Sequence, residues 1–172
     1  GTAAGPYSTP VPPAARLRQQ SNWNGLRLPT PEKWDPGQIR FGLGFLYWRK
    51  EQWEPCATAL QPFLTDPSLR ANSSRAEALY MLGRCKLTLG QVAPGQGALE
   101  RVVQDHPDFK GIEDVYVELV RSHVKAANWE HVQRYCQLYV QKYPTGLRRT
   151  YVDLCTALMK IGKGQVEAGE RE

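Results

Sequence analysis

No apolar run in this sequence approaches the roughly 18 residues that a bilayer-crossing helix requires, so we expect no transmembrane segment. The three histidines, His106, His123 and His131, form neither an H-x-x-x-H nor an H-E-x-x-H pattern, and no two cysteines have the C-x-x-C spacing. Zinc and redox sites depend on such closely spaced ligands. We therefore expect no metal and no cofactor.

Catalytic motifs are also missing. The sequence contains no G-x-x-x-x-G-K-[ST] loop for phosphates, no G-x-S-x-G elbow, and no cysteine paired with a histidine that would orient it. Gly42-Leu43-Gly44 resembles part of a dinucleotide-binding fingerprint, but it lies within a predicted helix rather than after a strand. Because no two groups can be given the roles of acid, base or nucleophile, we expect that the chain is not an enzyme.

Cysteines are few and lie far apart, at Cys56, Cys85, Cys136 and Cys155. Each occupies an apolar or small-residue position of a predicted helix, where a free cysteine packs as a small hydrophobe. Structural disulfides are instead typical of small secreted domains. We therefore expect four free, buried thiols and a reducing compartment.

The overall composition is ordinary for a globular protein, with 41% hydrophobic and 23% charged residues. At 172 residues the chain is long enough for one domain with a continuous core. The formal net charge is +5 and the sequence pI is near 9.1. A net positive charge of this size fits binding to an acidic protein, a nucleic acid or an anionic membrane surface. It also fits a basic face that is simply exposed to solvent.

The most informative pattern lies in the middle of the chain. Leu82-Gly83 is followed by Gly90, then by Gly95 and Leu99, and finally by Pro107. A small Gly83 allows a second helix to approach, and glycine at Gly90 ends the first helix. Gly95 marks the crossing of the second helix, Leu99 fills the contact one turn further on, and Pro107 cannot continue the helical hydrogen bonds. The pattern predicts two helices joined by a short turn.

The same pattern recurs on both sides of this segment. Upstream are Leu43-Gly44, Cys56, Leu60 and Pro67; downstream are Leu119, Trp129, Val132, Cys136 and Pro144; a fourth first helix carries Leu154 and ends at Gly162. The intervals between the leading leucines are 39, 37 and 35 residues. Pro55 and Pro94 share a phase in the first turn of a second helix, where a missing N–H costs nothing. The chain is thus predicted to be an all-α solenoid of about three helix-turn-helix repeats plus a capping helix.

We predict helices at 38–50, 54–64, 75–89, 93–105, 112–126, 129–142 and 147–161, and no strands. The repeat domain covers 38–162, in the segments 38–68, 75–108, 112–145 and 147–162, and a polar tail follows at 163–172. Asn128 is a good N-cap for the helix after it. Trp48, Trp53 and Trp129 are expected in the core.

The first 37 residues differ from the rest of the chain. Seven of the 13 prolines lie there and no helical period is sustained, which predicts an extended, proline-rich N-terminal arm. Apolar side chains stand in its second half, at Trp23, Leu26, Leu28 and Trp34. We expect Leu28 and Trp34 to cap the open edge of the first repeat, and residues 1–15 to contact a partner.

Over residues 38–162 these motifs resemble the tetratricopeptide and pentatricopeptide superfamily. The departures are the lack of Trp at the first signature position, Lys86 and His123 in place of an aromatic, and Val120 in place of Gly. In size, basic character, start without Met and proline-rich arm, the layout is similar to the helical-repeat subunit that euglenozoan mitochondria attach to the F1 part of ATP synthase. That resemblance implies a non-catalytic subunit, bound to the F1 α-subunit on the matrix side of the mitochondrion.

In this superfamily the first helix of each pair lines a concave face, so the resemblance indicates which residues face a groove. They are Phe41, Phe45 and Arg49; Tyr80 and Arg84; Glu118, Arg121 and Lys125; and Asp153 and Lys160. Aromatic residues and arginine are frequent interface anchors. We predict that Phe41, Phe45, Arg49, Tyr80, Arg84, Arg121 and Lys125 bind a partner protein. For Phe41 and Phe45, packing under the arm is the alternative.

The predicted function is that of a non-catalytic assembly subunit docked on the protein subunits of a larger complex. One alternative is a pentatricopeptide-like RNA-binding protein, although about three repeats reading one base each would specify few bases. Another is a bacterial periplasmic scaffold, against which the buried lone cysteines and the lack of an N-terminal lipidated cysteine count. The corresponding locations are the mitochondrion, the cytoplasm or the bacterial periplasm.

Overall fold

The structure is a computed structural model that describes residues 35–169, with side chains through Gly164; the predicted arm, including Leu28 and Trp34, lies outside the described residues. The chain divides into two compact units after Asp35, and the described helices belong to the second. They are α2 (Pro36–Arg49), α3 (Trp53–Leu60), α4 (Pro62–Thr65), the 3-10 turn η2 (Pro67–Leu69), α5 (Arg75–Thr88), α6 (Val92–Asp105), α7 (Ile112–Lys125), α8 (Trp129–Lys142) and α9 (Arg149–Gly169). No strand occurs between residues 35 and 169, and the predicted all-α solenoid is confirmed.

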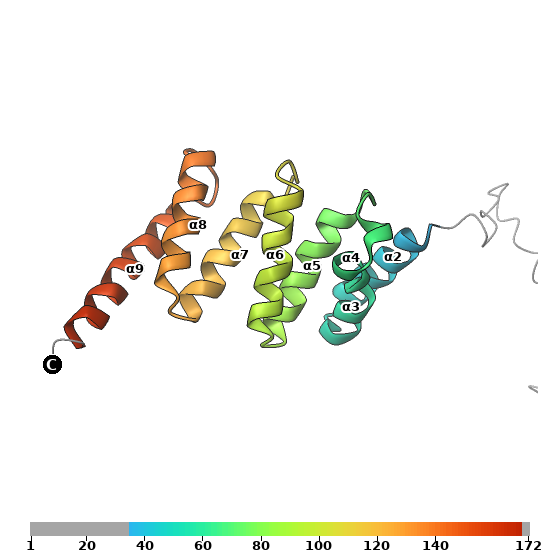
Figure 1. The fold of residues 1–172 in the computed structure, drawn as a ribbon, viewed down its shortest axis with the longest axis horizontal. Coiled ribbons are helices and arrows are strands. Elements are labelled where there is room, and N and C mark those ends of the chain that lie inside the picture. The colour runs from blue at the N-terminus through green and yellow to red at the C-terminus, as the bar shows by residue number, and fades with distance from the viewer. Residues whose placement is uncertain (1–34, 170–172) are drawn as a thin grey trace, which may run out of the picture. The chain divides into compact units, whose positions relative to one another are not determined.

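Helices that follow one another in the sequence pack against one another. Figure 1 shows the pairs α2 with α3, α5 with α6, and α7 with α8 standing in a row, with α9 against α8 at the end. Each pair also touches the next, through α3 and α5 and through α6 and α7. None of the helices between Pro36 and Gly169 has both the length and the apolar character needed to cross a membrane.

Several helix boundaries differ from the prediction. The first helix begins at Pro36 rather than at residue 38, because proline suits the first turn of a helix. The helix predicted at 54–64 is divided into α3 and α4, since the nitrogen of Pro62 has no hydrogen to donate. The end predicted at Gly162 is wrong, because α9 continues to Gly169 through most of the predicted polar tail. Gly162 is buried where a Cβ would meet the ring of Trp129, so it serves a close contact rather than a helix stop.

The turn between the two helices of a pair has the same geometry in each repeat. One residue is left-handed, with φ of 55° at Glu51, 75° at Gly90 and 51° at Ala127. The residue after it donates a backbone hydrogen bond back across the helix end, as from Gln91 N to Lys86 O at 2.8 Å. This is the hydrogen-bonded helix ending for which glycine is the best residue. Gly90 therefore ends α5 as the sequence predicts.

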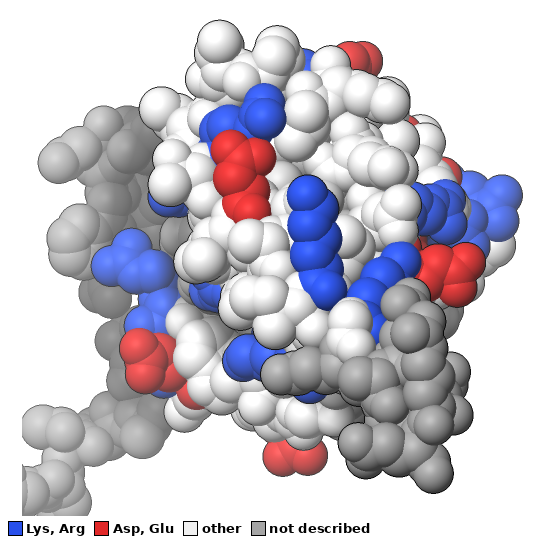
Figure 2. Space-filling model, turned by 90° about the vertical axis from the view of Figure 1, so that its left-hand side faces the viewer, with Lys and Arg blue, Asp and Glu red and all other residues white. Residues whose placement is uncertain are grey.

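The leading leucines of the four first helices lie in two environments. Leu82 and Leu119, in the inner repeats, are fully buried. Leu43 in α2 and Leu154 in α9 are 44% and 56% exposed, because within the described part of the chain no further repeat covers them. Figure 2 views the α9 end of the row, where uncharged surface lies between scattered charged side chains. A solenoid buries these positions only by stacking a neighbour on them.

Glycines allow α5 and α6 to cross closely. A Cβ added at Gly83 would lie 2.6 Å from Leu99 Cγ and 3.1 Å from the carbonyl oxygen of Gly95. One added at Gly95 would lie 2.8 Å from Leu87 Cγ. Both glycines are thus at the helix crossing, where the sequence pattern places them. In the third repeat, Val120 takes the position of Gly83 and is itself fully buried.

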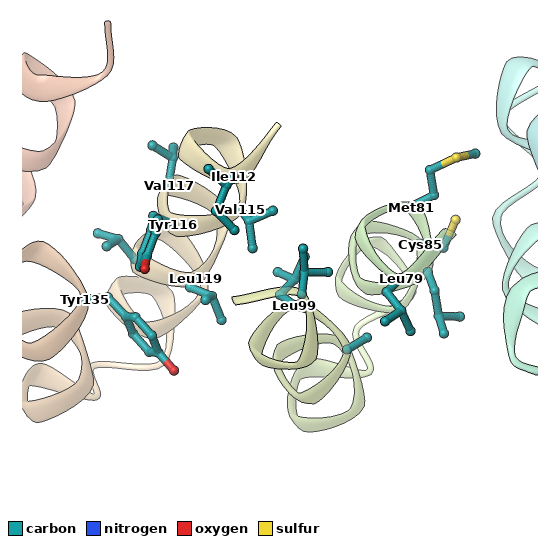
Figure 3. Packing of buried hydrophobic residues seen from close by; sticks show 14 of the residues in the cluster. Leu79, Met81, Cys85, Leu99, Ile112, Val115, Tyr116, Val117, Leu119 and Tyr135 are labelled. Carbon is teal, nitrogen blue, oxygen red and sulfur yellow. The ribbon is translucent and has the colours of Figure 1, made fainter. Parts of the chain in front are cut away.

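The core is one continuous cluster that runs along the row of helices. Figure 3 shows side chains of α5, α6, α7 and α8 meeting between neighbouring helices, among them Leu79, Leu99, Leu119 and Tyr135. The four cysteines are buried in it as free thiols. The tryptophans Trp48, Trp53 and Trp129 are half-buried against its edge rather than within it, with the rings of Trp48 and Trp53 edge to face at 5.4 Å.

One buried charge joins the first two repeats. Arg75, only 5% exposed at the start of α5, donates from Nε to the Phe63 carbonyl at 3.2 Å. Its Nη1 donates to Asp105 Oδ2 at 2.8 Å, and the same nitrogen lies 3.1 Å from His106 Nε2. Arg75 thereby ties α4 to the end of α6, a role that the sequence pattern does not predict.

A candidate protein-binding groove

Four of the predicted partner-binding residues lie together on one surface: Tyr80 and Arg84 from α5, and Arg121 and Lys125 from α7. A hollow of about 250 Å³ is bordered by Arg84, Arg121 and Lys125. A second hollow of about 340 Å³ is bordered by Tyr80, Arg84 and Arg121. Because Arg84, Glu118 and Arg121 border both, the two hollows are adjacent, and together they are called here the basic groove.

Arg84 is held at the centre of the basic groove by aromatic rings. Its guanidinium carbon lies 5.2 Å from the centre of the Trp48 ring and 5.8 Å from that of Tyr80. Nη1 donates to the Tyr80 hydroxyl at 3.5 Å. Burial raises the pKa of the Tyr80 hydroxyl, which therefore remains a neutral hydrogen-bonding group. The Arg84 side chain is still 41% exposed, so one side of the guanidinium remains available to a ligand.

Glu118 connects the two arginines of the groove. Its Oε1 lies 3.2 Å from Arg121 Nη1 and 3.7 Å from Arg84 Nε. The Glu118 side chain is only 14% exposed, whereas that of Arg121 is 46% exposed. Arg121 also lies over the ring of Tyr151, and hydrogen bonding to the Tyr151 hydroxyl raises the pKa of Arg121. Both arginines are thus held in position by aromatic rings and by Glu118.

Positive charge exceeds negative charge along the groove. Its cations are Arg84, Arg121, Lys125 and Arg148, and its carboxylates are Glu118 and Asp114. Asp114 is paired with Arg148 at 3.2 Å. The other carboxylate, Glu118, is shared between Arg84 and Arg121. Lys125, exposed at the end of α7, has no ion pair with the other residues that the structure describes. The groove therefore suits an anionic ligand.

The remaining predicted site residues lie elsewhere. Phe41 and Phe45 contact each other on α2, with ring centres 6.4 Å apart, and Arg49 is exposed at the end of that helix. None of the three borders the basic groove among the described residues. Only Trp48 connects α2 with the groove, through its contact with Arg84.

The prediction that Asp153 and Lys160 continue the same groove is wrong. They border a separate hollow of about 550 Å³ between α8 and α9. Asp153 is paired there with Arg149, one turn earlier in α9, at 2.9 Å. The residue of α9 that does reach the basic groove is Tyr151, whose ring lies beside Arg121.

Among the basic and aromatic residues at the basic groove, sequence reasoning missed Arg148 and Tyr151, which border it, and Trp48, which supports Arg84 from α2. Trp48 is interpreted from the sequence as core, although its ring supports Arg84. Tyr151 lies in the last helix. The sequence pattern takes Leu154 as the guide to the buried side of that helix, but Leu154 is exposed, so the pattern does not show which way Tyr151 faces. Arg148 lies in the turn before α9, where no helical period applies. A basic or aromatic residue on either side of the phase assigned to α9 is a signal that could have found Arg148 and Tyr151.

Chemically, the groove can bind carboxylates. Guanidinium groups bind carboxylates through paired hydrogen bonds, and arginines stacked on aromatic rings present these donors in a fixed direction. Across the described residues, no group of His, Cys, Asp and Glu is placed to hold a metal ion. The groove thus offers guanidinium donors that can bind the carboxylates of a negatively charged segment.

The comparisons agree with this architecture. Residues 77–108, which cover most of α5 and all of α6, match the tetratricopeptide repeat family. A search among curated proteins gave no match. The chain therefore contains a tetratricopeptide-like helical repeat, and similar helix pairs stand on both sides of it. Repeats of this kind are typical of protein-protein interaction scaffolds and are typically non-catalytic.

Proposed function

We propose that this chain is a non-catalytic scaffold subunit that binds an acidic segment of a partner protein in its basic groove. The observation that carries the proposal is the arrangement of Arg84 and Arg121 around a single carboxylate, Glu118. Both arginines retain exposed guanidinium surface, and Lys125 adds a charge beside them. Complementary charges of this kind accelerate association and select the partner.

The resemblance in layout supports a more specific form of this proposal. In that form the partner is the F1 part of mitochondrial ATP synthase, contacted through its α-subunit, and the chain resides on the matrix side. The basic character of the chain and its short, closely paired repeats are consistent with that assignment. The proposed arm contact, through residues 1–15, would add to the groove contact.

The groove proposal is tested by reversing its charges. We expect the double variant Arg84→Glu/Arg121→Glu to lose co-purification of the partner while keeping the helical circular dichroism of the parent. The matched control is Arg101→Glu/Arg134→Glu, which makes the same charge change at exposed positions of α6 and α8 outside the groove. Mass spectrometry of the purified material identifies the partner. Unchanged partner recovery with the groove variant, or equal loss with the control, would refute the groove as the binding site.

The same variants address the RNA-binding alternative. Any tetratricopeptide-like solenoid with a basic face attracts nucleic acid at low salt. Only RNA bound with sequence preference at physiological salt, and lost in the groove variant, would replace the protein-scaffold proposal. Recovery of F1 subunits would support the more specific assignment, whereas recovery of a different complex would retain the scaffold and exclude F1.

A further inference from the structure

The last helix, α9, has two apolar faces on opposite sides. One face carries Val152, Cys155 and Met159, all buried against α8 and α7. The opposite face carries Leu154, Leu158 and Ile161, which are 56%, 42% and 59% exposed. The outer helix of a solenoid normally has a polar outer face, which keeps the end of the stack soluble. The outer face of α9, as this stripe is called below, is the reverse of such a cap.

Small residues alternate with the large ones along this outer face. Small and large residues alternate in the order Thr150, Leu154, Ala157, Ile161, Gly164, at spacings of four and three residues. The three small residues are exposed. A Cβ at Gly164 would meet nothing within 4 Å, so nothing in the described repeats explains a glycine there. Glycine within a helix costs about 1 kcal/mol of stability relative to alanine. A close neighbour outside the described fold would explain it.

We propose that the outer face of α9 binds α9 of a second copy of this chain, antiparallel and related by a two-fold axis. When Leu154 faces Ala157 of the second copy, Ile161 faces Thr150, so these two large side chains each meet a small one. The same alignment brings Leu147, which is 95% exposed in the turn before α9, towards Gly164 of the second copy. A two-fold axis makes every such contact occur twice.

The charges beside the stripe fit the same alignment. Asp153 and Lys160 lie on one edge of the outer face, and both are exposed. In antiparallel helices the residues flanking the apolar stripe pair along each edge, as in coiled coils. The alignment brings Asp153 of each copy to within two residues of direct register with Lys160 of the other, which are the flanking positions that pair along one edge, so Asp153 and Lys160 can form two ion pairs across the dimer. Asp153 is already ordered by Arg149 at 2.9 Å, and the second copy adds a further cation to that carboxylate.

Figure 2 views the end of the row formed by α9, where uncharged side chains cover much of the visible described surface. Charged side chains are scattered across this end of the row rather than confined to its margin. The basic groove lies between α5, α7 and the start of α9 and shares no residue with the outer stripe. Self-association would therefore give a scaffold with two partner-binding grooves.

Sedimentation velocity of the full chain over a concentration series tests the proposal. We expect a reversible monomer–dimer equilibrium, which Ala157→Trp shifts to monomer because the indole prevents close approach. Ala157 is exposed, so this variant should keep the helical content of the parent. The control is Leu46→Asp on the opposite end of the row, where Leu46 is 58% exposed; it should leave the dimer unchanged. Loss of association in Leu46→Asp would instead indicate head-to-tail stacking and would overturn the two-fold arrangement.

Charge exchange tests the alignment itself. Asp153→Lys and Lys160→Asp should each weaken the dimer, because each variant places like charges opposite one another. An equimolar mixture of the two variants should restore dimerisation as a heterodimer, since each chain then supplies the charge that the other lacks. The groove variant Arg84→Glu/Arg121→Glu should dimerise like the parent, so partner binding and self-association fail independently. A parent chain that remains monomeric at every concentration, or a mixture that does not recover, would overturn the proposal.

Discussion

A single methyl group at Gly83 should destabilise the protein, even though alanine is the better helix former. Alanine in place of glycine stabilises a helix interior by about 1 kcal/mol. At Gly83 the new Cβ would lie 2.6 Å from Leu99 Cγ and 3.1 Å from the Gly95 carbonyl oxygen. Leu99 is fully buried and the carbonyl belongs to the backbone, so neither can move without displacing other parts of the core. Overpacking of this kind costs about 1–3 kcal/mol.

The matched variant is Gly97→Ala, in the helix that Gly83 faces. A Cβ at Gly97 meets nothing within 4 Å, so this change should show only the gain in helix propensity. The unfolding free energies of the two variants, measured by urea denaturation with circular dichroism, should differ by the overpacking cost of about 1–3 kcal/mol. Gly83→Trp should be worse still.

A double-mutant cycle identifies the contact responsible. Leu99→Ala alone should cost about 2–5 kcal/mol, because it leaves a cavity in the core. With Leu99 shortened, the Cβ at Gly83 has room, so Gly83→Ala should cost less in that background than in the parent. The reasoning fails if Gly83→Ala behaves like Gly97→Ala, or if its cost is the same with and without Leu99.

Three further expectations follow from the fold, each checked by urea denaturation. Arg75→Leu should lose about 2–3 kcal/mol, since it removes charged hydrogen bonds to Phe63 and Asp105, whereas the exposed neighbour Arg70→Leu should change little. Gly90→Ala should cost about 1 kcal/mol because a φ of 75° is strained for alanine; its Cβ meets no neighbour, so the cost reports the backbone alone, and no loss would contradict the left-handed turn. Burial, and secondarily His131, lowers the pKa of His123, so the unfolded chain takes up the proton first as the pH falls below about 6.5. Stability should therefore fall with decreasing pH in that range, and His123→Gln should reduce the slope; an equal slope in both would contradict this.

The sequence predicts the repeat architecture well because its signals are local. Gly83 and Gly95 are glycine because two helices cross closely there, and Gly90 is glycine because its backbone is left-handed. The spacing of the three residues along the chain is enough to predict both reasons. Gly162 shows where such reasoning fails. Its reason for being glycine is contact with Trp129, from a different helix, and a close contact cannot be distinguished from a helix end within one segment.

The groove is only partly predictable for a related reason. Tyr80, Arg84, Arg121 and Lys125 follow from the phase of inner helices, whose buried sides are fixed by neighbours on both sides. At the ends of the row the buried side is set by one neighbour only. The phase assigned to α9 was therefore displaced, so that Asp153 and Lys160 were expected where Tyr151 lies.

The position of Glu118 makes it an internal competitor for any partner of the basic groove. Its carboxylate already occupies the place between Arg84 and Arg121 that a ligand carboxylate would take. A weakly acidic segment gains little by displacing it, whereas a segment with several carboxylates can engage Lys125 and Arg148 as well. If the groove binds an acidic segment as proposed, the residue that holds the two arginines in place would also set a minimum negative charge for that segment.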